Sequence, residues 1–389
     1  MIKGGEFLIK DQEAKDIFIP EEFGEDQLMM ASATKEFVEK ELDPHREQFE
    51  KKDYQLTEDC MKKAGELGLL GISVPAEYGG MGMPFNTSVL ICDKISGANG
   101  SFSTAFGAHT GIGTLPILLY GDDTQRKKYL PKLATGEWMG CYCLTEPGAG
   151  SDANSGKTKA VLTKDSKHYL ITGQKMWISN AGFADVFIVF ARIEDDKNIT
   201  GFILEKEMEG ITMGEEEYKL GLNSSSTRQV FFNDVKVPVE NMLGGRGNGF
   251  KIALNSLNVG RIKLAAACLD ALKRVTSLGV QYATEREQFN TKIIDFEAIR
   301  EKVAQMATDS YVGESACYRA AKDIENRIKI RHDSGNSFQE AELKGVEEYV
   351  IECSILKVAL SEDCQNATDE GIQIFGGMGF SAETPMESA

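Results

Sequence analysis

The spacing of hydrophobic residues changes twice along the chain and divides it into three regions. Up to about residue 138, apolar positions such as Leu28 and Ala31 recur every three or four residues, as they do on one face of a helix. Pro75 and the glycine pair at 79–80 interrupt this pattern. Residues 1–138 are therefore predicted to form an N-terminal α-helical domain of short helices.

The middle region consists of short runs rich in β-branched and aromatic residues. Polar turn residues separate the runs, for example at 165–166, 180–182 and 233–234. This pattern predicts short antiparallel strands, and residues 139–247 are expected to form a β domain. The runs cover residues 161–163, 169–172, 186–190, 201–204, 230–232 and 235–237.

Helical periodicity returns after residue 248 in longer pieces. The three runs cover residues 249–284, 295–321 and 340–371, with a loop predicted at 326–338. Three long helices are one fewer than a four-helix bundle contains. Residues 248–389 are therefore expected to form an incomplete C-terminal helical bundle domain, and the fold class is a multi-domain α+β protein.

Composition and charge exclude several classes of function. The 389 residues carry a formal net charge of −17, which argues against nucleic acid as a partner because phosphate binding requires a basic surface. No apolar stretch is long enough for a transmembrane segment. The first residues form neither a secretory signal nor an arginine-rich transit peptide, so a bacterial-type cytoplasmic protein is expected. The eight cysteines are scattered without a CxxC pair, which predicts reduced thiols and no metal site.

Two segments of the β region carry candidate binding chemistry. Residues 141–152 run from a strand end into a turn of small residues, where glycines allow close approach of a planar ligand or a pyrophosphate. Residues 173–180 place Trp177, one of two tryptophans, near small polar residues, where its ring could cover an aromatic cofactor. Taken singly, the first segment could be an ordinary loop and Trp177 a core residue. No GxGxxG motif precedes a helix, so a Rossmann site is not expected.

Together these segments resemble the acyl-CoA dehydrogenase family, and the very-long-chain type most closely. The resemblance covers nearly the whole chain and includes six further segments, at residues 74–80, 127–133, 232–238, 258–261, 286–289 and 373–380. It implies an FAD flavoprotein that removes two hydrogens from a fatty acyl-CoA thioester in β-oxidation. It also implies an electron-transfer flavoprotein as the electron acceptor.

The resemblance assigns roles to particular residues. Tyr142, Leu144 and Thr145 would border the flavin, and Trp177 and Ser179 would lie against its ring and pyrophosphate. The pyrophosphate and adenosine of FAD would be held by Arg286, Gln288 and Phe289, and, across a dimer interface, by Gln373, Gly376 and Gly377. A homodimer or tetramer is therefore expected. The residue after Phe289 is Asn290, where relatives usually have glycine, which leaves the local turn open.

The same resemblance implies a substrate site. Ser151 would contact both FAD and acyl-CoA, Arg261 would lie near the reacting end of the substrate, and Asn258 near its pantetheine. Without the family resemblance, Arg261 and Arg286 would be interpreted as surface arginines. Ala108 would stand where a glutamate closes the shorter cavity of the medium-chain enzyme. A small residue there predicts a preference for long-chain acyl-CoA, because each buried CH₂ contributes about 0.8 kcal/mol.

The catalytic base of the family is a glutamate in one of two places. Gly260 occupies the first place and has no side chain to act, and the second place is expected beyond Ala389. Glu383 and Glu387 come too early in the motif and are expected to be exposed carboxylates. No catalytic residue is therefore assigned within the chain, which is expected to be truncated. The alternatives are an acyl-CoA oxidase on the same fold and a flavin-binding assembly or scaffold protein without catalysis.

Overall fold

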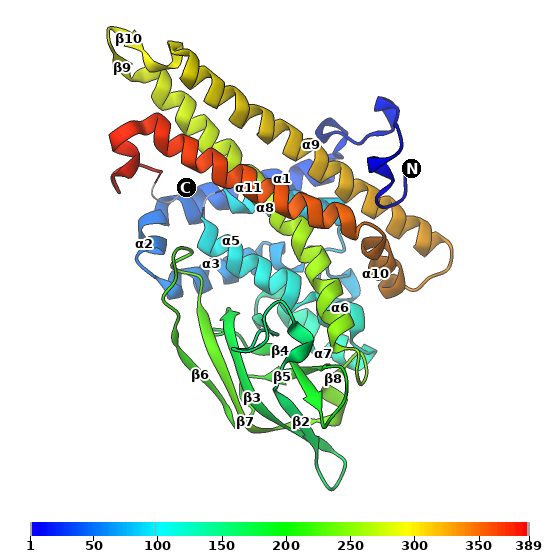
Figure 1. The fold of residues 1–389 in the computed structure, drawn as a ribbon. Coiled ribbons are helices and arrows are strands. Elements are labelled where there is room, and N and C mark those ends of the chain that lie inside the picture. The colour runs from blue at the N-terminus through cyan, green and yellow to red at the C-terminus, as the bar shows by residue number, and fades with distance from the viewer. Residues whose placement is uncertain (1, 98, 387–389) are drawn as a thin grey trace.

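The molecule places its N-terminal helices between a β domain and a set of long C-terminal helices (Figure 1). This arrangement comes from a computed structural model, which describes residues 2–97 and 99–386. The predicted fold class, with a helical, a β and a second helical region in that order, is confirmed. None of the helices in the described ranges is long and apolar enough to cross a bilayer.

Within the described residues, the N-terminal region contains seven short α-helices. On α1, Ala31 is buried as predicted but Leu28 is 52% exposed. The reason is that the buried stripe of α1 follows Met30, Thr34 and Phe37, and Leu28 lies well to one side of that stripe. The helices are α1 (Glu25–Phe37), α2 (Arg46–Glu50), α3 (Tyr54–Glu66), α4 (Phe85–Ser96), α5 (Gly100–Gly107), α6 (Leu115–Tyr120) and α7 (Asp123–Thr135), and a π-helical turn (Ala108–Gly113) follows α5.

The β domain is built on one sheet whose strand order is β6-β7-β3-β2-β4-β5-β8, with β1 paired to β4. Most pairs are antiparallel, as predicted, but β1 and β2 both pair with β4 in parallel. The strands are β1 (Gly140–Cys143), β2 (Lys159–Leu162), β3 (His168–Ser179), β4 (Val186–Ile193), β5 (Thr200–Glu205), β6 (Ile211–Glu216), β7 (Thr227–Pro238) and β8 (Met242–Leu243).

The turn predicted at 233–234 was wrong, because β7 continues through these residues. Asn233 and Asp234 lie opposite the single residue Thr172 of β3, which is a β-bulge. The φ angle of Asp234 is +50°, and its carboxylate accepts a hydrogen bond from the Thr172 hydroxyl at 2.6 Å. The polar residues therefore mark a bulge inside one long strand.

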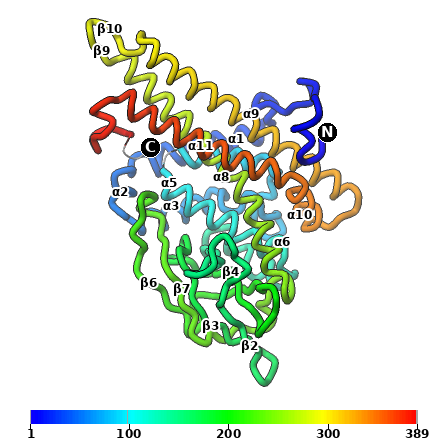
Figure 2. Tube along the Cα trace, in the orientation of Figure 1, coloured from blue at the N-terminus to red at the C-terminus, as the bar shows by residue number. Residues whose placement is uncertain are grey.

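The C-terminal region contains three long helices and one short one. α8 (Gly249–Glu285) and α9 (Glu297–Asp333) are joined by a hairpin of β9 (Glu287–Gln288) and β10 (Thr291–Lys292). The tube in Figure 2 traces α11 (Val350–Phe375) alongside α8. The loop predicted at 326–338 was largely wrong, because α9 continues to Asp333. The run predicted at 340–371 breaks at Tyr349 into α10 (Phe338–Glu348) and α11.

A buried histidine ties the N-terminal helices to the first strand of the β domain. His109 is fully buried, and its Nδ1 accepts a hydrogen bond from the Gly140 N–H at 2.9 Å. The neutral ring therefore carries its proton on Nε2, which lies 2.9 Å from the Leu133 carbonyl oxygen and donates to it. Burial lowers the pKa of His109 to about 4. This contact sets where β1 begins, two residues before Tyr142.

We predict that His109 makes folding sensitive to mild acid. The pKa of His109 in the folded protein is about 4, below the usual value of 6.5. The contribution of His109 to the free energy of unfolding is therefore complete above pH 6.5 and is lost as the pH falls toward 4. The loss reaches about 2 kcal/mol at pH 5. Urea unfolding at pH 7.5 and pH 5 measures the free energy of unfolding of the protein and of its His109→Gln variant. The difference between these two free energies should be smaller at pH 5 by about that amount. The matched control His332→Gln, at an exposed position, should show a pH-independent difference. An unchanged gap for His109→Gln would contradict the prediction.

Candidate functional site

A cavity of about 420 Å³ lies between the β domain and α8, and it brings seven predicted site residues together. The β domain contributes the end of β1, the turn that follows it and the end of β3. From α8 come Leu254, Leu257 and Arg261, and Ile112 of the π-helical turn completes the wall. The seven residues are Tyr142, Leu144, Thr145, Ser151, Trp177, Ser179 and Arg261.

A buried ion pair joins the two β segments that line this cavity. The Lys175 ammonium of β3 donates to Glu146 Oε1 at 2.7 Å and to the Leu144 carbonyl at 3.1 Å, so it holds the turn after β1 at two points. The side chains of Lys175 and Glu146 are only 2% and 7% exposed. The Met176 N–H also donates to the Thr145 carbonyl at 2.9 Å. Thr145 is thereby fixed next to Trp177.

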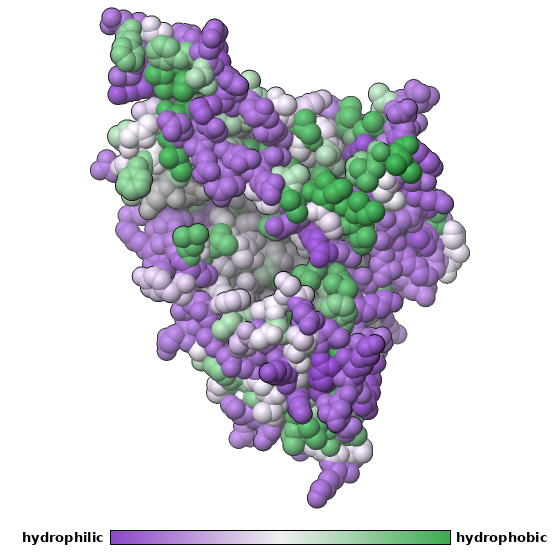
Figure 3. All heavy atoms as spheres, viewed as in Figure 1, coloured by the Kyte–Doolittle hydropathy of each residue, from purple (hydrophilic) through white to green (hydrophobic). Residues whose placement is uncertain are grey.

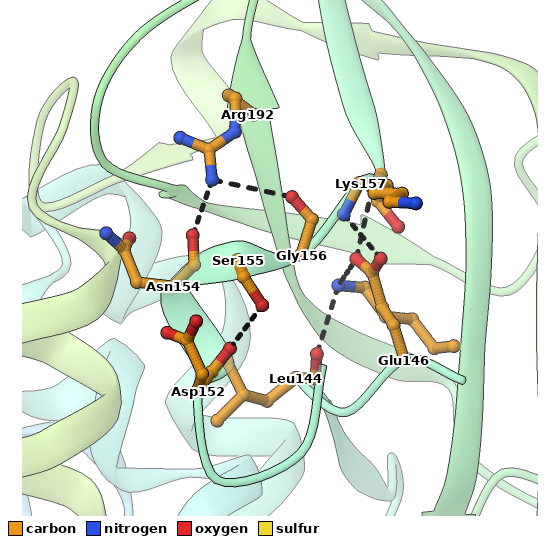
Figure 4. A network of polar contacts seen from close by, with 10 residues as sticks. Leu144, Glu146, Asp152, Asn154, Ser155, Gly156, Lys157 and Arg192 are labelled. Carbon is orange, nitrogen blue, oxygen red and sulfur yellow. Dashed lines mark hydrogen bonds and ion pairs between the residues drawn. The ribbon is translucent and has the colours of Figure 1, made fainter. Parts of the chain in front are cut away.

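Glu146 is ionised in this setting. Burial alone would raise the pKa of its carboxyl, but the Lys175 charge and hydrogen bonds lower it below the usual range. Two of these hydrogen bonds come from the backbone N–H groups of Lys157 and Thr158, at 2.5 and 3.1 Å. Figure 4 shows Glu146 facing Lys157 across the turn. Both members of the charged pair therefore make several hydrogen bonds, which a buried ion pair needs to remain charged.

A second set of contacts fixes the turn between Ser151 and β2. The Arg192 guanidinium of β4 donates to the carbonyls of Asn154 and Gly156, as Figure 4 shows. The Ser155 hydroxyl donates to the Asp152 carbonyl at 2.7 Å. Ser151 itself is exposed at the edge of the cavity. Its hydroxyl is therefore available to a ligand on a turn that the neighbouring contacts hold in place.

Trp177 has an unusual conformation. Its φ angle is +58°, and it lies in a bulge of β3 between Lys175 and Ile178. A bulky residue with positive φ costs conformational energy, and such outliers gather at functional sites. Its side chain is 61% exposed although it lines the cavity. An exposed aromatic ring held in this way provides a surface for stacking a planar ligand.

The cavity walls suit a ligand that is planar and partly polar. The Tyr142 hydroxyl is buried without a hydrogen-bond partner among the described residues. At Gly148 and Gly150 an added Cβ would meet nothing within 4 Å, so the backbone there borders open space. Open backbone and an exposed indole fit an isoalloxazine ring, and small-molecule sites commonly combine apolar walls with a few polar groups.

Three glycines of α5, the π turn and α8 have open space beside their backbone. An added Cβ at Gly107, Gly111 or Gly260 would meet nothing within 4 Å. Arg261 donates a hydrogen bond to the side chain of Asn258, which is only 7% exposed. Ala108 is buried in the π turn and, like Asn258, is not part of the cavity wall.

The remaining predicted residues lie elsewhere, at the far end of α8 from the cavity (Figure 1). The Tyr282 ring of α8 stacks on the Phe375 ring of α11 with centroids 4.2 Å apart, which brings the end of each helix together. Six exposed residues lie within seven positions of these two aromatic residues in the sequence, and we call them the distal cluster. They are Arg286, Gln288, Phe289, Gln373, Gly376 and Gly377.

The turn at Asn290 is a tight two-residue hairpin. Phe289 and Asn290 have φ angles of +56° and +59°, and they connect the paired residues Gln288 and Thr291. Positive φ at both central residues is typical of a type I′ turn, in which asparagine is well tolerated. The change from glycine therefore leaves a regular hairpin, with the Phe289 ring 88% exposed.

Comparison with known proteins identifies the family. Family models for the N-terminal, middle and C-terminal domains of acyl-CoA dehydrogenase match residues 24–137, 141–235 and 247–389. A crystal structure of an acyl-CoA dehydrogenase complexed with FAD from Bacillus anthracis is 44% identical, with a TM-score of 0.95 over 100% of this chain and 68% of that chain. The chain belongs to the acyl-CoA dehydrogenase family.

Two curated relatives in this family are longer than the chain. A probable acyl-CoA dehydrogenase of Bacillus subtilis is 46% identical over 100% of this chain, which covers 65% of that protein. The very long-chain specific acyl-CoA dehydrogenase of Rattus norvegicus is 39% identical over 86% of this chain and 49% of its own length. The chain thus spans about half to two thirds of the length of these relatives.

The contacts that support this cavity were not predicted from the sequence. Lys175 and Glu146 were passed over, although a lysine among the inward-facing residues of a strand usually has a buried partner. The apolar wall from Phe250, Leu254 and Ile112 was also missed. These residues lie on helices whose hydrophobic pattern does not distinguish a cavity wall from a packed core.

We predict that Lys175→Met destabilises the protein by about 3–5 kcal/mol, because it leaves the Glu146 carboxylate buried without its countercharge. Urea or thermal unfolding measures the loss. Lys167→Met, at an exposed position in the same sheet region, is the matched control and should change stability by less than about 0.5 kcal/mol. The double variant Lys175→Met with Glu146→Gln should recover part of the loss. Equal stabilities of Lys175→Met and the control would show that the ion pair does not hold the turn.

Proposed function

We propose that the chain binds FAD in the cavity beside Trp177 and catalyses, as part of its enzyme, the α,β-dehydrogenation of an acyl-CoA thioester. The observation that carries this proposal is the exposed, strained Trp177 ring held beside Thr145 by the Glu146–Lys175 pair. The similar Bacillus anthracis protein, whose structure is described as complexed with FAD, supports it.

The chain's residues would divide the work of binding and orientation. Trp177 would stack on the flavin, Thr145 and Tyr142 would offer hydroxyl groups to its polar edge, and Ser151 would contact both ligands. FAD, when bound, supplies the acceptor for the β-hydride of the substrate. Arg261 would lie near the thioester end, where its charge favours the enolate-like oxygen that develops as the α-proton leaves.

We propose that the complete flavin site needs two copies of the chain. Arg261 lines the cavity, whereas Arg286 lies about 38 Å further along α8, because a helix rises about 1.5 Å per residue. The exposed distal cluster is therefore suited to the cofactor of a second subunit. Hydrophobic side chains also gather over α11 in Figure 3, where Ile351, Ile355 and Val358 are 45%, 44% and 50% exposed. Exposed apolar patches of this kind commonly mark protein interfaces.

A subunit-mixing experiment tests the shared site. Trp177→Asn and Arg286→Ala should each weaken FAD binding by at least about tenfold, since each removes one part of every site. Asn is chosen because it tolerates the positive φ of position 177. When the two variants are co-expressed, random dimers contain about a quarter of fully intact sites, because each mixed dimer has one intact and one doubly defective site.

Flavin absorbance per chain after gel filtration measures the outcome. Recovery of about a quarter of the wild-type FAD is expected for the mixture, and none for either variant alone. Tyr218→Ala, which removes an aromatic ring that is 95% exposed, is the control and should keep full binding. If the mixture binds no more FAD than the separate variants, the cavity and the distal cluster do not share one cofactor.

We also propose a long-chain acyl-CoA as the substrate and an electron-transfer flavoprotein as the electron acceptor. The open space at Gly107, Gly111 and Gly260 supports a deep acyl slot. The identity with a very long-chain specific dehydrogenase supports the same preference.

Within the described ranges, the cavity wall contains no carboxylate, and Glu383 is exposed on the segment after α11. Glu387 lies outside the described residues. We propose that none of the wall residues is the catalytic base.

An anaerobic titration with palmitoyl-CoA tests both proposals on substrate and base. The visible flavin band of the FAD-loaded chain should shift as palmitoyl-CoA binds but should not bleach, because the described cavity wall has no carboxylate to remove the α-proton. Palmitoyl-CoA should bind more tightly than butyryl-CoA, since each additional buried CH₂ contributes about 0.8 kcal/mol. Bleaching would show that the chain contains a base. Tighter binding of butyryl-CoA would contradict the long-chain preference.

A further inference from the structure

A second cavity, of about 400 Å³, lies on the opposite face of α8 from the flavin cavity. Its wall from α8 consists of Asn255, Val259 and Lys263, whereas Leu254, Leu257 and Arg261 line the flavin cavity. At 100° per residue the two sets lie on different sides of the helix. The second cavity is therefore separate from the site proposed for FAD and acyl-CoA.

Most of this cavity wall is apolar. It is formed by α6, α8, α10 and the segment that precedes α4. A cavity of a few hundred Å³ with apolar walls and few polar groups has the character of a small-molecule site. The apolar residues that bear on the argument are Leu115, Leu119, Val259, Phe338, Leu343 and Val346.

Two ionisable side chains line this apolar cavity and form no ion pair with each other. Lys263 lines the cavity and is 7% exposed, and within the described ranges no hydrogen bond or ion pair engages its ammonium. An ammonium without a partner in a cavity with mostly apolar walls is poorly solvated, so a ligand that supplies an anionic acceptor would be favoured there. Glu342 of α10 lines the same cavity.

The protonation of Glu342 makes it compatible with an anion. Burial raises the pKa of its carboxyl to about 7, although the Lys263 charge opposes this and Glu325 of α9 adds to it. Near neutral pH, a substantial fraction of Glu342 is therefore a neutral acid that can donate a hydrogen bond. Glu77 is the other carboxylate in the cavity wall, and it comes from the segment before α4.

We propose that this cavity binds a medium-chain carboxylic acid, with its carboxylate between Lys263 and Glu342 and its alkyl chain against the apolar wall. A single ammonium with a neutral acid suits one carboxylate. An amine would be repelled by Lys263, and inorganic phosphate would leave the apolar wall unused. Because the residues involved differ from those of the flavin cavity, binding here can be measured separately from FAD binding.

Titration calorimetry of the FAD-loaded chain with decanoate tests this assignment. Decanoate should bind saturably, and Lys263→Met should weaken binding by about tenfold or more. Lys251→Met, at an exposed position on α8, is the matched control and should bind as the wild type does. Leu343→Phe, which reduces the cavity, should also weaken binding. Flavin absorbance should be unchanged in all three variants, which separates this result from any failure of the FAD site.

The dependence on pH and head group makes the test sharper. Decanoate affinity should rise about tenfold from pH 8 to pH 6, because protonated Glu342 donates to the ligand and ionised Glu342 repels it. Glu342→Gln should bind equally at both values. Absence of saturable decanoate binding, equal affinity for decanol, or unchanged binding in Lys263→Met would overturn the proposal. Competition by palmitoyl-CoA would also overturn it, because it would place decanoate in the acyl slot.

Discussion

The buried pair of Glu146 and Lys175 is the interaction on which the flavin cavity depends. It takes one residue from the turn after β1 and one from β3, segments that are far apart in sequence, and fixes their relative position with hydrogen bonds to Leu144 and two backbone N–H groups. Burying two charges is costly, and a hydrophobic pair could replace them at little loss of stability. The charged pair also favours one alignment of the two segments, because its hydrogen bonds are satisfied only in that alignment.

That alignment also explains how strain at Trp177 can persist. A positive φ at a bulky residue is unfavourable unless its neighbours determine the backbone. Here Lys175 on one side is held by its ion pair, and Met176 donates to Thr145. The Trp177 ring therefore remains in the cavity wall even though most of it is exposed. Contacts within the protein thus order this part of the wall, and such ordering reduces the entropy that ligand binding must overcome.

Hydrophobic periodicity predicted the three regions and most of their helices and strands, and motif resemblance identified the family. The predictions of loops and turns were wrong where the same residue types occur in two kinds of local structure. Asn233 and Asp234 are common in turns but here form a bulge, and the polar end of α9 was mistaken for a loop. The motifs also selected residues for the cavity without showing that Arg286 lies too far along α8 to reach it. Distance along a rigid helix becomes evident only when the helix boundaries are known.

The length of α8 has an evolutionary consequence. Its first half lines the flavin cavity on one face and the second cavity on another, and its last turn leads to the distal cluster. Inserting one residue between Leu257 and Tyr282 would rotate everything beyond it by about 100° and shift it by about 1.5 Å. The distal cluster would then lose its orientation relative to the flavin cavity. If the cavity and the distal cluster serve one cofactor, exposed side chains of α8 outside these two regions can vary among descendants of this chain, whereas the number of residues in α8 cannot.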